Sequence, residues 1–196
     1  GGIQIEIATP KGNMVIQSRL LGIHNAYNML MATAAAHLAG LNNDQICEGF
    51  RKYPGVKRRF ELLKILEGGT ELITDYGHHP TEIGAVLKAV KSETKNKVIA
   101  VFEAHRCSRL KALMNEFALV FKGVDRLILT DIHTAGEPDE TEILVRELMA
   151  RTGDVPSVYV PRNQIYDYLV KEFCQGERVI LFTAGKLDSV VRERIV

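Results

Sequence analysis

The sequence predicts an α/β fold: a Rossmann-like, mainly parallel six-stranded sheet with flanking helices, preceded by a β-hairpin and two helices. After residue 59, strand-like runs alternate with helix-like runs of about 10 to 15 residues, which is the pattern of βαβ units. Three strand-like runs (KVIAVF, RLILTD and RVILFT) are nearly all apolar, as expected for strands that helices cover on both faces.

The individual elements follow from the same patterns. Strands are predicted at 60–66, 71–75, 97–102, 125–131, 157–160 and 178–183, and helices at about 80–94, 108–122, 140–151, 163–174 and 186–195. Earlier in the chain, the alternating runs 3–8 and 14–20 flank a TPKGN turn and predict the hairpin. The Ala-, Met- and Leu-rich run 25–39 predicts a buried helix, and Asn42 or Asn43 is expected to cap a second helix that reaches about Lys52.

A short polar joint at 53–59 separates the two parts of the chain. It contains Pro54 and Gly55, which end the preceding helix, and the basic run Lys57-Arg58-Arg59. We therefore divide the chain into residues 1–54 and 55–196. Because the sequence begins directly in strand-like residues and without Met, we interpret it as a piece of a longer protein.

The composition excludes several classes of function. The 25 basic and 24 acidic side chains give a net charge of +1, which offers no electrostatic basis for binding nucleic acid or an anionic membrane. No apolar run approaches the roughly 18 residues that a membrane span requires. Cys47, Cys107 and Cys174 are widely spaced, which argues against a disulfide framework or a zinc site and indicates the cytoplasm.

The loop after the second strand of the predicted sheet, DYGHHPTE (75–82), is the first candidate site, because ligands of such sheets lie beyond the carboxyl ends of the strands. Pro80 and Glu82 suit the first turn of the following helix. Adjacent histidines point in different directions, so a shared metal ion is not expected. Each polar residue also has a structural interpretation, as a cap, a packed ring or a surface group. The side chains that can bond a ligand are Asp75, Tyr76, His78 and His79.

The loop HRCSR (105–109) follows the next strand. Arg106 and Arg109 are three residues apart at a predicted helix start, so we expect both guanidinium groups on one face. Two such groups suit an anion, and a carboxylate is bound bidentately. The alternative is a pair of solvated arginines, but cations at a helix start oppose the helix dipole unless an anion is present.

Two asparagines open the first apolar helix. Asn25 and Asn28 share a face at this spacing, and the donor and acceptor of an amide match the edge of adenine. The alternative is ordinary capping of the helix by Asn25. The chain has no phosphate-binding loop of the GxxxxGK[ST] type, no GxGxxG, no GxSxG and no HExxH. From the residues alone, the prediction is an α/β domain that binds a small anionic ligand.

In combination, these motifs resemble the Mur ligase family. HNAYNMLMATAAAHLAG resembles the family's His-Asn-x-x-Asn helix, which ends the central ATPase domain, and GVKRRFE resembles the joint into the C-terminal domain. ITDYGHHPTEI, HRCSR and HTAGE resemble loops of the alanine-adding branch, the last with His133 where the pattern has Tyr. The sequence departs from the pattern at Thr74, where the family has Asp, at Cys107, where it has an aromatic residue, and at TAGKLDS, where it has Gly-Ala-Gly-Asp-Ile.

The resemblance implies ATP-dependent joining of L-alanine to UDP-N-acetylmuramate in peptidoglycan synthesis, by way of an acyl phosphate. By the same resemblance, residues 1–54 are the end of the ATP-binding central domain and 55–196 the amino-acid-binding C-terminal domain. The phosphate loop, the Mg²⁺ ligands and the UDP-binding domain lie outside this chain. The chain therefore holds no metal ligand and is expected to be inactive without those parts.

The resemblance also implies roles at the matching positions. Asn25 and Asn28 hold adenine, Asp75 binds the ribose, and Arg59 contacts the ATP phosphates at the hinge as a catalytic residue. Tyr76 and His78 shape the amino-acid pocket, His78 as a catalytic residue, and Arg106 and Arg109 bind the alanine carboxylate.

Three alternative functions stay open. The ligase that recycles a preformed tripeptide has loops resembling Asp-Phe-Ala-His-His-Pro and lacks the paired arginines, so Tyr76-Gly77 and Arg106 with Arg109 discriminate against it. A non-catalytic module that binds an amino acid or nucleotide is a second alternative, and a generic scaffold is a third.

Overall fold

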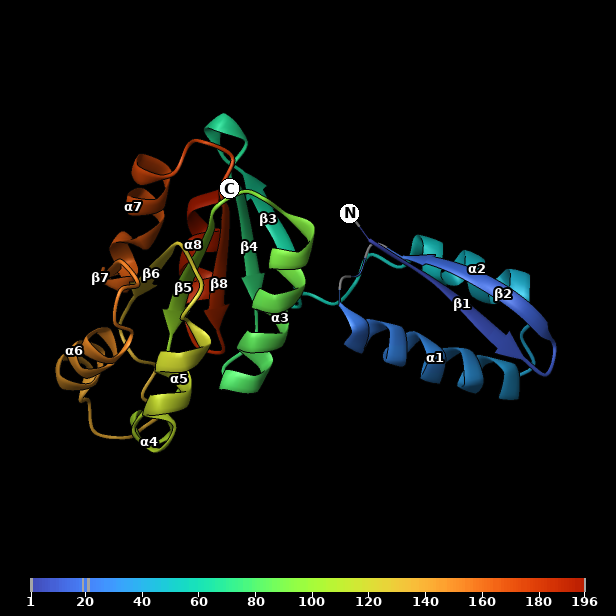
Figure 1. Ribbon diagram of the computed structural model, residues 1–196, viewed down its shortest axis with the longest axis horizontal. Helices are drawn as coiled ribbons and strands as arrows, with labels where there is room; N and C mark the ends of the chain where they lie inside the picture. The colour runs from blue at the N-terminus through green and yellow to red at the C-terminus, as the bar shows by residue number, and fades with distance from the viewer. Residues whose placement is uncertain (1, 19, 21, 196) are drawn as a thin grey trace. The chain divides into compact units, whose positions relative to one another are not determined.

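The computed structural model of this chain describes residues 2–18, 20 and 22–195 (Figure 1). The chain forms two compact units, one reaching to Val56 and the other starting at Lys57, where the sequence placed the division after residue 54. Among the described residues, no helix combines the length and apolar content that a membrane crossing requires.

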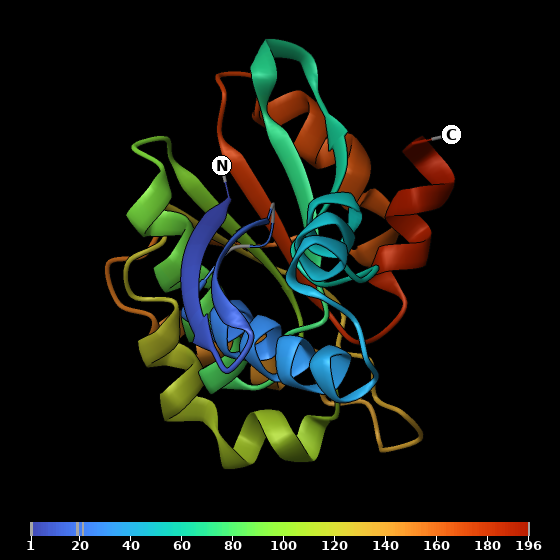
Figure 2. The same ribbon diagram turned by 90° about the vertical axis from the view of Figure 1, so that its right-hand side faces the viewer.

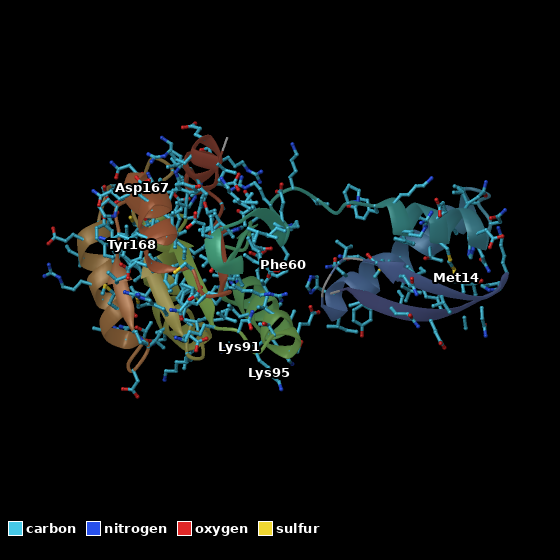
Figure 3. All side chains as sticks on the ribbon, turned by 90° about the horizontal axis from the view of Figure 1, so that it is seen from above. Met14, Phe60, Lys91, Lys95, Asp167 and Tyr168 are labelled. Atoms are coloured by element: carbon cyan, nitrogen blue, oxygen red, sulfur yellow. The ribbon has the colours of Figure 1, made fainter. Side chains whose placement is uncertain are left out.

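The N-terminal unit is a hairpin with two helices. Strands β1 (Ile3–Thr9) and β2 (Gly12–Ser18) pair antiparallel, and α1 (Ile23–Leu38) and α2 (Asn43–Lys52) follow. Met14, labelled in Figure 3, is buried in a small core that the hairpin forms with both helices. Asn42 caps α2 through a reciprocal pair of hydrogen bonds with Gln45, which settles the choice between Asn42 and Asn43.

The prediction that the first helix is buried was wrong for this chain. Only Met29 and Thr33 of α1 are buried, whereas Ile23, Met31 and Leu38 are 72%, 71% and 92% exposed. The reason is that the described residues of this unit cover one side of the helix only. An apolar composition records a preference for burial, but it does not supply the neighbour that buries it.

The second unit contains the six-stranded sheet, in the order β3-β4-β8-β5-β6-β7. All neighbouring pairs are parallel except β3 with β4. The predicted α/β class with a mainly parallel sheet is therefore confirmed. The strand bounds are β3 Glu61–Ile65, β4 Glu71–Asp75, β5 Val98–Glu103, β6 Arg126–Leu129, β7 Ser157–Tyr159 and β8 Arg178–Thr183.

Helices cover both faces of this sheet and make three layers. One face packs against α3 (Pro80–Glu93), α4 (Cys107–Ala112), α5 (Met114–Val120) and α6 (Thr141–Arg151). The other packs against α7 (Ile165–Glu172) and α8 (Leu187–Ile195), so that α8 and α3 lie on opposite sides in Figure 2. Short 3-10 turns lie at Glu67–Gly69 and Arg162–Gln164. Alternate residues of β5 face opposite layers, which explains why this strand is apolar throughout.

The single helix predicted at 108–122 is two helices. Leu113 separates α4 from α5 with φ −116° and ψ 25°, which are not helical values. Its side chain packs against the same core as Leu110 and Met114, so the break lets both short helices turn apolar residues inward. No Gly or Pro marks this position, and the sequence therefore carried no signal for the break.

Candidate functional site

Loops from three strands meet at the carboxyl edge of the sheet. The loop after β5 is joined to the loop after β6 by a parallel bridge between His105 and His133. In that bridge the Arg106 N–H donates to the His133 carbonyl at 2.9 Å, and the His133 N–H donates to the Ala104 carbonyl at 2.8 Å. These two hydrogen bonds hold the backbones of the two loops to one another, which keeps their side chains in place for binding.

Asp75 holds together the chain segments around the loop after β4. One carboxylate oxygen accepts the Gly77 N–H at 2.7 Å and the other accepts the Phe60 N–H at 2.9 Å. The residue is 4% exposed, and this burial raises the pKa of the Asp75 carboxyl although both hydrogen bonds oppose the rise. Asp75 thus has a structural task in this chain, and only its remaining lone pairs are open to a ligand.

Tyr76 and His78 form the adjacent wall of the site. Tyr76 is 37% exposed, and the Arg58 guanidinium lies 4.7 Å from the centre of its ring. The His78 ring stands edge-on to it at 5.4 Å, with Nδ1 3.1 Å from the Tyr76 carbonyl oxygen and 3.6 Å from a carboxylate oxygen of Glu82. A carbonyl only accepts, so Nδ1 carries the proton and Nε2 of a neutral His78 is the free acceptor.

Three imidazoles run along this edge of the sheet, and we call His78, His105 and His133 the histidine row. The ring centres of His78 and His105 lie 5.8 Å apart, and those of His105 and His133 lie 5.2 Å apart. Partial burial lowers the pKa of the His105 imidazole, and the neighbouring cations, His133 first, lower it further. The middle ring of the row is therefore kept in its neutral form.

The two arginines of the HRCSR loop do not share a helix face, which corrects the prediction from their spacing. Arg106 precedes α4 with φ 72°, a left-handed conformation, so the three-residue spacing does not apply to it. Its guanidinium lies 3.7 Å from the Glu137 carboxylate and its side chain is 51% exposed. Glu137 also accepts the Ser108 N–H at 2.9 Å and the Ser108 hydroxyl at 2.6 Å. The anion expected at this helix start is therefore the protein's own Glu137.

Arg109 instead lies against His105, the middle residue of the histidine row. Its Nη1 lies 3.5 Å from Nδ1 of His105 and 3.5 Å from the His105 carbonyl oxygen. Both distances are long for hydrogen bonds, so the guanidinium retains most of its capacity to bind a carboxylate. The structure thus brings Arg109, His105, His78 and Tyr76 together at one edge.

Arg59, Asn25 and Asn28 are the remaining predicted site residues. Arg59 is exposed beside the loop 75–82, where its charge lowers the pKa of the Asp75 and Glu82 carboxyls as a minor contribution. Asn28 donates its side-chain amide to the Asn25 side-chain oxygen at 3.3 Å on α1. The capping alternative for Asn25 is wrong, because α1 begins at Ile23 and Gly22 is its cap residue. These asparagines belong to the N-terminal unit, and the histidine row to the other.

A buried ion pair behind the histidine row was missed at the sequence level. Glu103 is fully buried at the end of β5, where Arg162 Nε donates to one carboxylate oxygen at 2.6 Å. The other oxygen accepts from the Thr183 hydroxyl and from the Leu187 N–H, the latter at 3.1 Å. An acidic residue that ends an apolar strand was the available signal, but nothing in the sequence indicated Arg162 as its partner.

Gly185 packs directly against this ion pair and the histidine row. A Cβ at this position would lie 2.6 Å from a Glu103 carboxylate oxygen and 2.6 Å from the His133 Cβ, and neither neighbour is free to move. We expect Gly185→Ala to lower the free energy of unfolding by about 1–3 kcal/mol, as overpacking does. Urea unfolding followed by circular dichroism measures this. Gly49→Ala is the matched control, since its Cβ meets open space in α2 and should stabilise the helix. Equal stability of the Gly185 variant and the unsubstituted chain would contradict the packing argument.

A cavity of about 1270 Å³ borders the far end of the histidine row. His133, Arg162 and Lys186 line it together with residues of α6 and of the loop before that helix. Within the described part of the chain, no three His, Cys, Asp or Glu side chains are grouped to hold a metal ion.

Comparisons with known proteins identify the family of this chain. Residues 58–185 match the family model described as Mur ligase, glutamate ligase domain. The chain is 38% identical over 178 residues to the UDP-N-acetylmuramate–L-alanine ligase of Acetivibrio thermocellus, covering 89% of this chain and 38% of that protein. It is 46% identical over 172 residues to the enzyme of the same name from Brucella anthropi, covering 86% and 36%. The chain thus spans well under half the length of these relatives.

Among solved structures, the UDP-N-acetylmuramate–alanine ligase of Thermotoga maritima superimposes with a TM-score of 0.74 at 21% identity. The match covers 92% of this chain and 39% of that one. At this identity the likeness is one of fold.

Proposed function

This chain belongs to the Mur ligase family, and from that premise we propose that it is the amino-acid-binding part of a UDP-N-acetylmuramate–L-alanine ligase. We place the reaction in the cytoplasm, as a step of peptidoglycan synthesis. The observation that carries the proposal is the meeting of Arg109 with the histidine row and Tyr76 at the carboxyl edge of the sheet. Relatives that bear this enzyme name at up to 46% identity support it.

In this proposal, the chain positions L-alanine for attack on an activated muramate carboxyl group. Arg109, assisted by Arg106, binds the alanine carboxylate, while Tyr76 and His78 border the small side chain. Holding the amine next to its target supplies most of the acceleration that such a site provides. The amine then attacks the acyl phosphate, the bond between the acyl carbon and the phosphate oxygen breaks, and inorganic phosphate leaves.

We propose that this chain also supplies part of the ATP-binding site. Asn25 and Asn28 would face adenine, Asp75 would contact the ribose, and Arg59 would approach the phosphates. Arg59 fits this role as an exposed guanidinium, and Asp75 fits it less well because both its oxygens already accept backbone N–H groups. Mg²⁺ would neutralise phosphate charge, and the chain spans only 38% and 36% of the two ligases described above. We therefore place the Mg²⁺ ligands and the UDP-N-acetylmuramate site in parts that this chain lacks.

Residues 1–54 would accordingly be the end of an ATP-binding domain, and the unit that starts at Lys57 the amino-acid-binding domain. We expect the 196-residue chain to show no L-alanine-dependent phosphate release from ATP and UDP-N-acetylmuramate. The complete enzyme that contains it should release one phosphate for each alanine joined.

A phosphate-release assay with both proteins, and with L-alanine compared with a muramyl tripeptide side chain, tests the proposal. Turnover by the isolated chain would overturn the need for the missing parts. Preference of the complete enzyme for the tripeptide would identify it as the recycling ligase. Binding of L-alanine without any turnover by the complete enzyme would identify a non-catalytic module.

A further inference from the structure

We propose that His105 and Arg109 act as one unit on an α-amino acid: Arg109 binds the carboxylate, and Nδ1 of His105 accepts the proton that the ammonium group loses. This inference rests on the proposed ligase function and adds a catalytic residue to it. The sequence had assigned chemistry to His78 and to the arginines, and none to His105.

The spacing of the two groups matches the substrate class. Nη1 of Arg109 lies 3.5 Å from Nδ1 of His105. The carboxylate and the ammonium of an α-amino acid are carried by the same carbon atom, so both can engage neighbouring groups at once. A carboxylate on the Arg109 fork therefore brings the nitrogen of the same molecule to the His105 ring.

The contact between these two residues also favours one tautomer of His105. A guanidinium group only donates hydrogen bonds and is positively charged, so even at 3.5 Å it favours the tautomer with the lone pair on Nδ1 and the proton on Nε2. Before substrate binds, Arg109 engages this lone pair weakly. A bound carboxylate draws the guanidinium to itself and leaves Nδ1 free to accept a proton.

The charges around His105 favour its neutral form. His78 faces it from the loop after β4, His133 from the loop after β6, and Arg106 and Arg109 from its own loop and α4. All of these lower the pKa of His105 when they are cationic, and burial lowers it most. The nearby carboxylates have other partners.

Each carboxylate near His105 is bound to another group of the protein. Glu82 pairs with His78, and Glu137 pairs with Arg106 and Ser108. On the other side of His133, Glu103 is bound by Arg162. Lys186 lines the same cavity as His133 and adds another cation. His105 is therefore a neutral acceptor at neutral pH.

The proposed step balances as follows. The ammonium nitrogen transfers one proton to Nδ1 of His105 and thereby gains a lone pair. This lone pair forms the C–N bond to the acyl phosphate, and the acyl C–O bond breaks with its electrons passing to the departing phosphate. The nitrogen's surplus proton leaves with that phosphate, and the His105 imidazolium returns its proton to water.

The first test replaces His105 by Gln in the complete enzyme. General-base catalysis contributes about 10²–10⁴-fold, so kcat for L-alanine should fall at least 100-fold while its KM changes only a few-fold. The wild-type rate should fall as the pH drops through the pKa of His105, below the ordinary value of 6.5. H105Q should lose this acidic decline.

Hydroxylamine serves as the control nucleophile. It is a weak base that is already neutral near pH 7, so it attacks the acyl phosphate without a proton acceptor. Hydroxamate formation should proceed equally in wild type and H105Q. Absence of hydroxamate in the wild-type enzyme would instead overturn the proposed ligase function.

A second variant tests the same idea without removing His105. His133→Tyr removes an imidazole that lowers the pKa of His105 whenever that imidazole is protonated, so the pKa of His105 should rise and the acidic decline should move to higher pH. An unchanged profile in H133Y would overturn the proposal. Equal loss of the alanine and hydroxylamine reactions in H105Q would also overturn it, because His105 would then only support the structure.

Discussion

Replacing Arg162 by Ala should lower the free energy of unfolding of the C-terminal unit by about 3–5 kcal/mol, the usual cost of removing one member of a buried ion pair. Glu103 is fully buried, and Arg162 donates to its carboxylate at 2.6 Å. Without Arg162, a charged Glu103 keeps only the Thr183 hydroxyl and the Leu187 N–H as partners. Urea unfolding of the 196-residue chain, followed by hydrogen exchange in β5 and β8, measures the loss.

Paired variants separate the charge from the packing. Glu103→Gln in the Arg162→Ala background removes the stranded charge and should recover part of the lost stability, which a double-mutant cycle quantifies. Arg151→Ala is the surface control, since its salt bridge to Glu147 is half exposed and should contribute less than about 1 kcal/mol. Similar losses of stability in Arg162→Ala and Arg151→Ala would show that the buried ion pair contributes no more than an exposed one.

Arg109→Ala should reduce kcat/KM for L-alanine in the complete enzyme by roughly 30-fold to 5,000-fold, which corresponds to about 2–5 kcal/mol for losing a partner of a desolvated charge pair. Arg109 lies beside the histidine row, and its described contacts are the ring and the carbonyl of His105. Because neither of these groups is an anion, the charge of Arg109 is available to a carboxylate. Arg109→Lys keeps the charge but loses the planar fork, and should recover only part of the activity. Steady-state kinetics with varied alanine gives these values.

The same series separates the two arginines. Arg106 is 51% exposed and pairs with Glu137, so Arg106→Ala should cost less than Arg109→Ala, about tenfold or below. Arg146→Ala, on the surface of α6 with its side chain 80% exposed, should leave the kinetics unchanged. A larger loss from Arg106→Ala than from Arg109→Ala would reverse the assignment of the principal carboxylate ligand.

Three features of the structure differ from what the sequence patterns predicted. The predicted helix at 108–122 is broken at Leu113, and α1 is largely exposed despite its apolar composition. Periodicity reports which side chains prefer burial, whereas tertiary neighbours decide which of them are buried. Similarly, the three-residue spacing of Arg106 and Arg109 implied a shared face only if both residues were helical, and the left-handed backbone of Arg106 removes that condition.

The sequence by itself determined the mainly parallel α/β class, the approximate strand and helix positions of the C-terminal unit apart from the break at Leu113, and a cap for α2 at Asn42 or Asn43. It could do so because periodicity, apolar runs and capping residues act over a few neighbouring residues. Only the tertiary structure decided that β8 lies between β4 and β5, that three histidines form a row, and that Glu103 meets Arg162. These contacts join residues far apart in the chain. Their partners depend on how the strands are ordered and how each side chain satisfies its charge, and no local pattern encodes either.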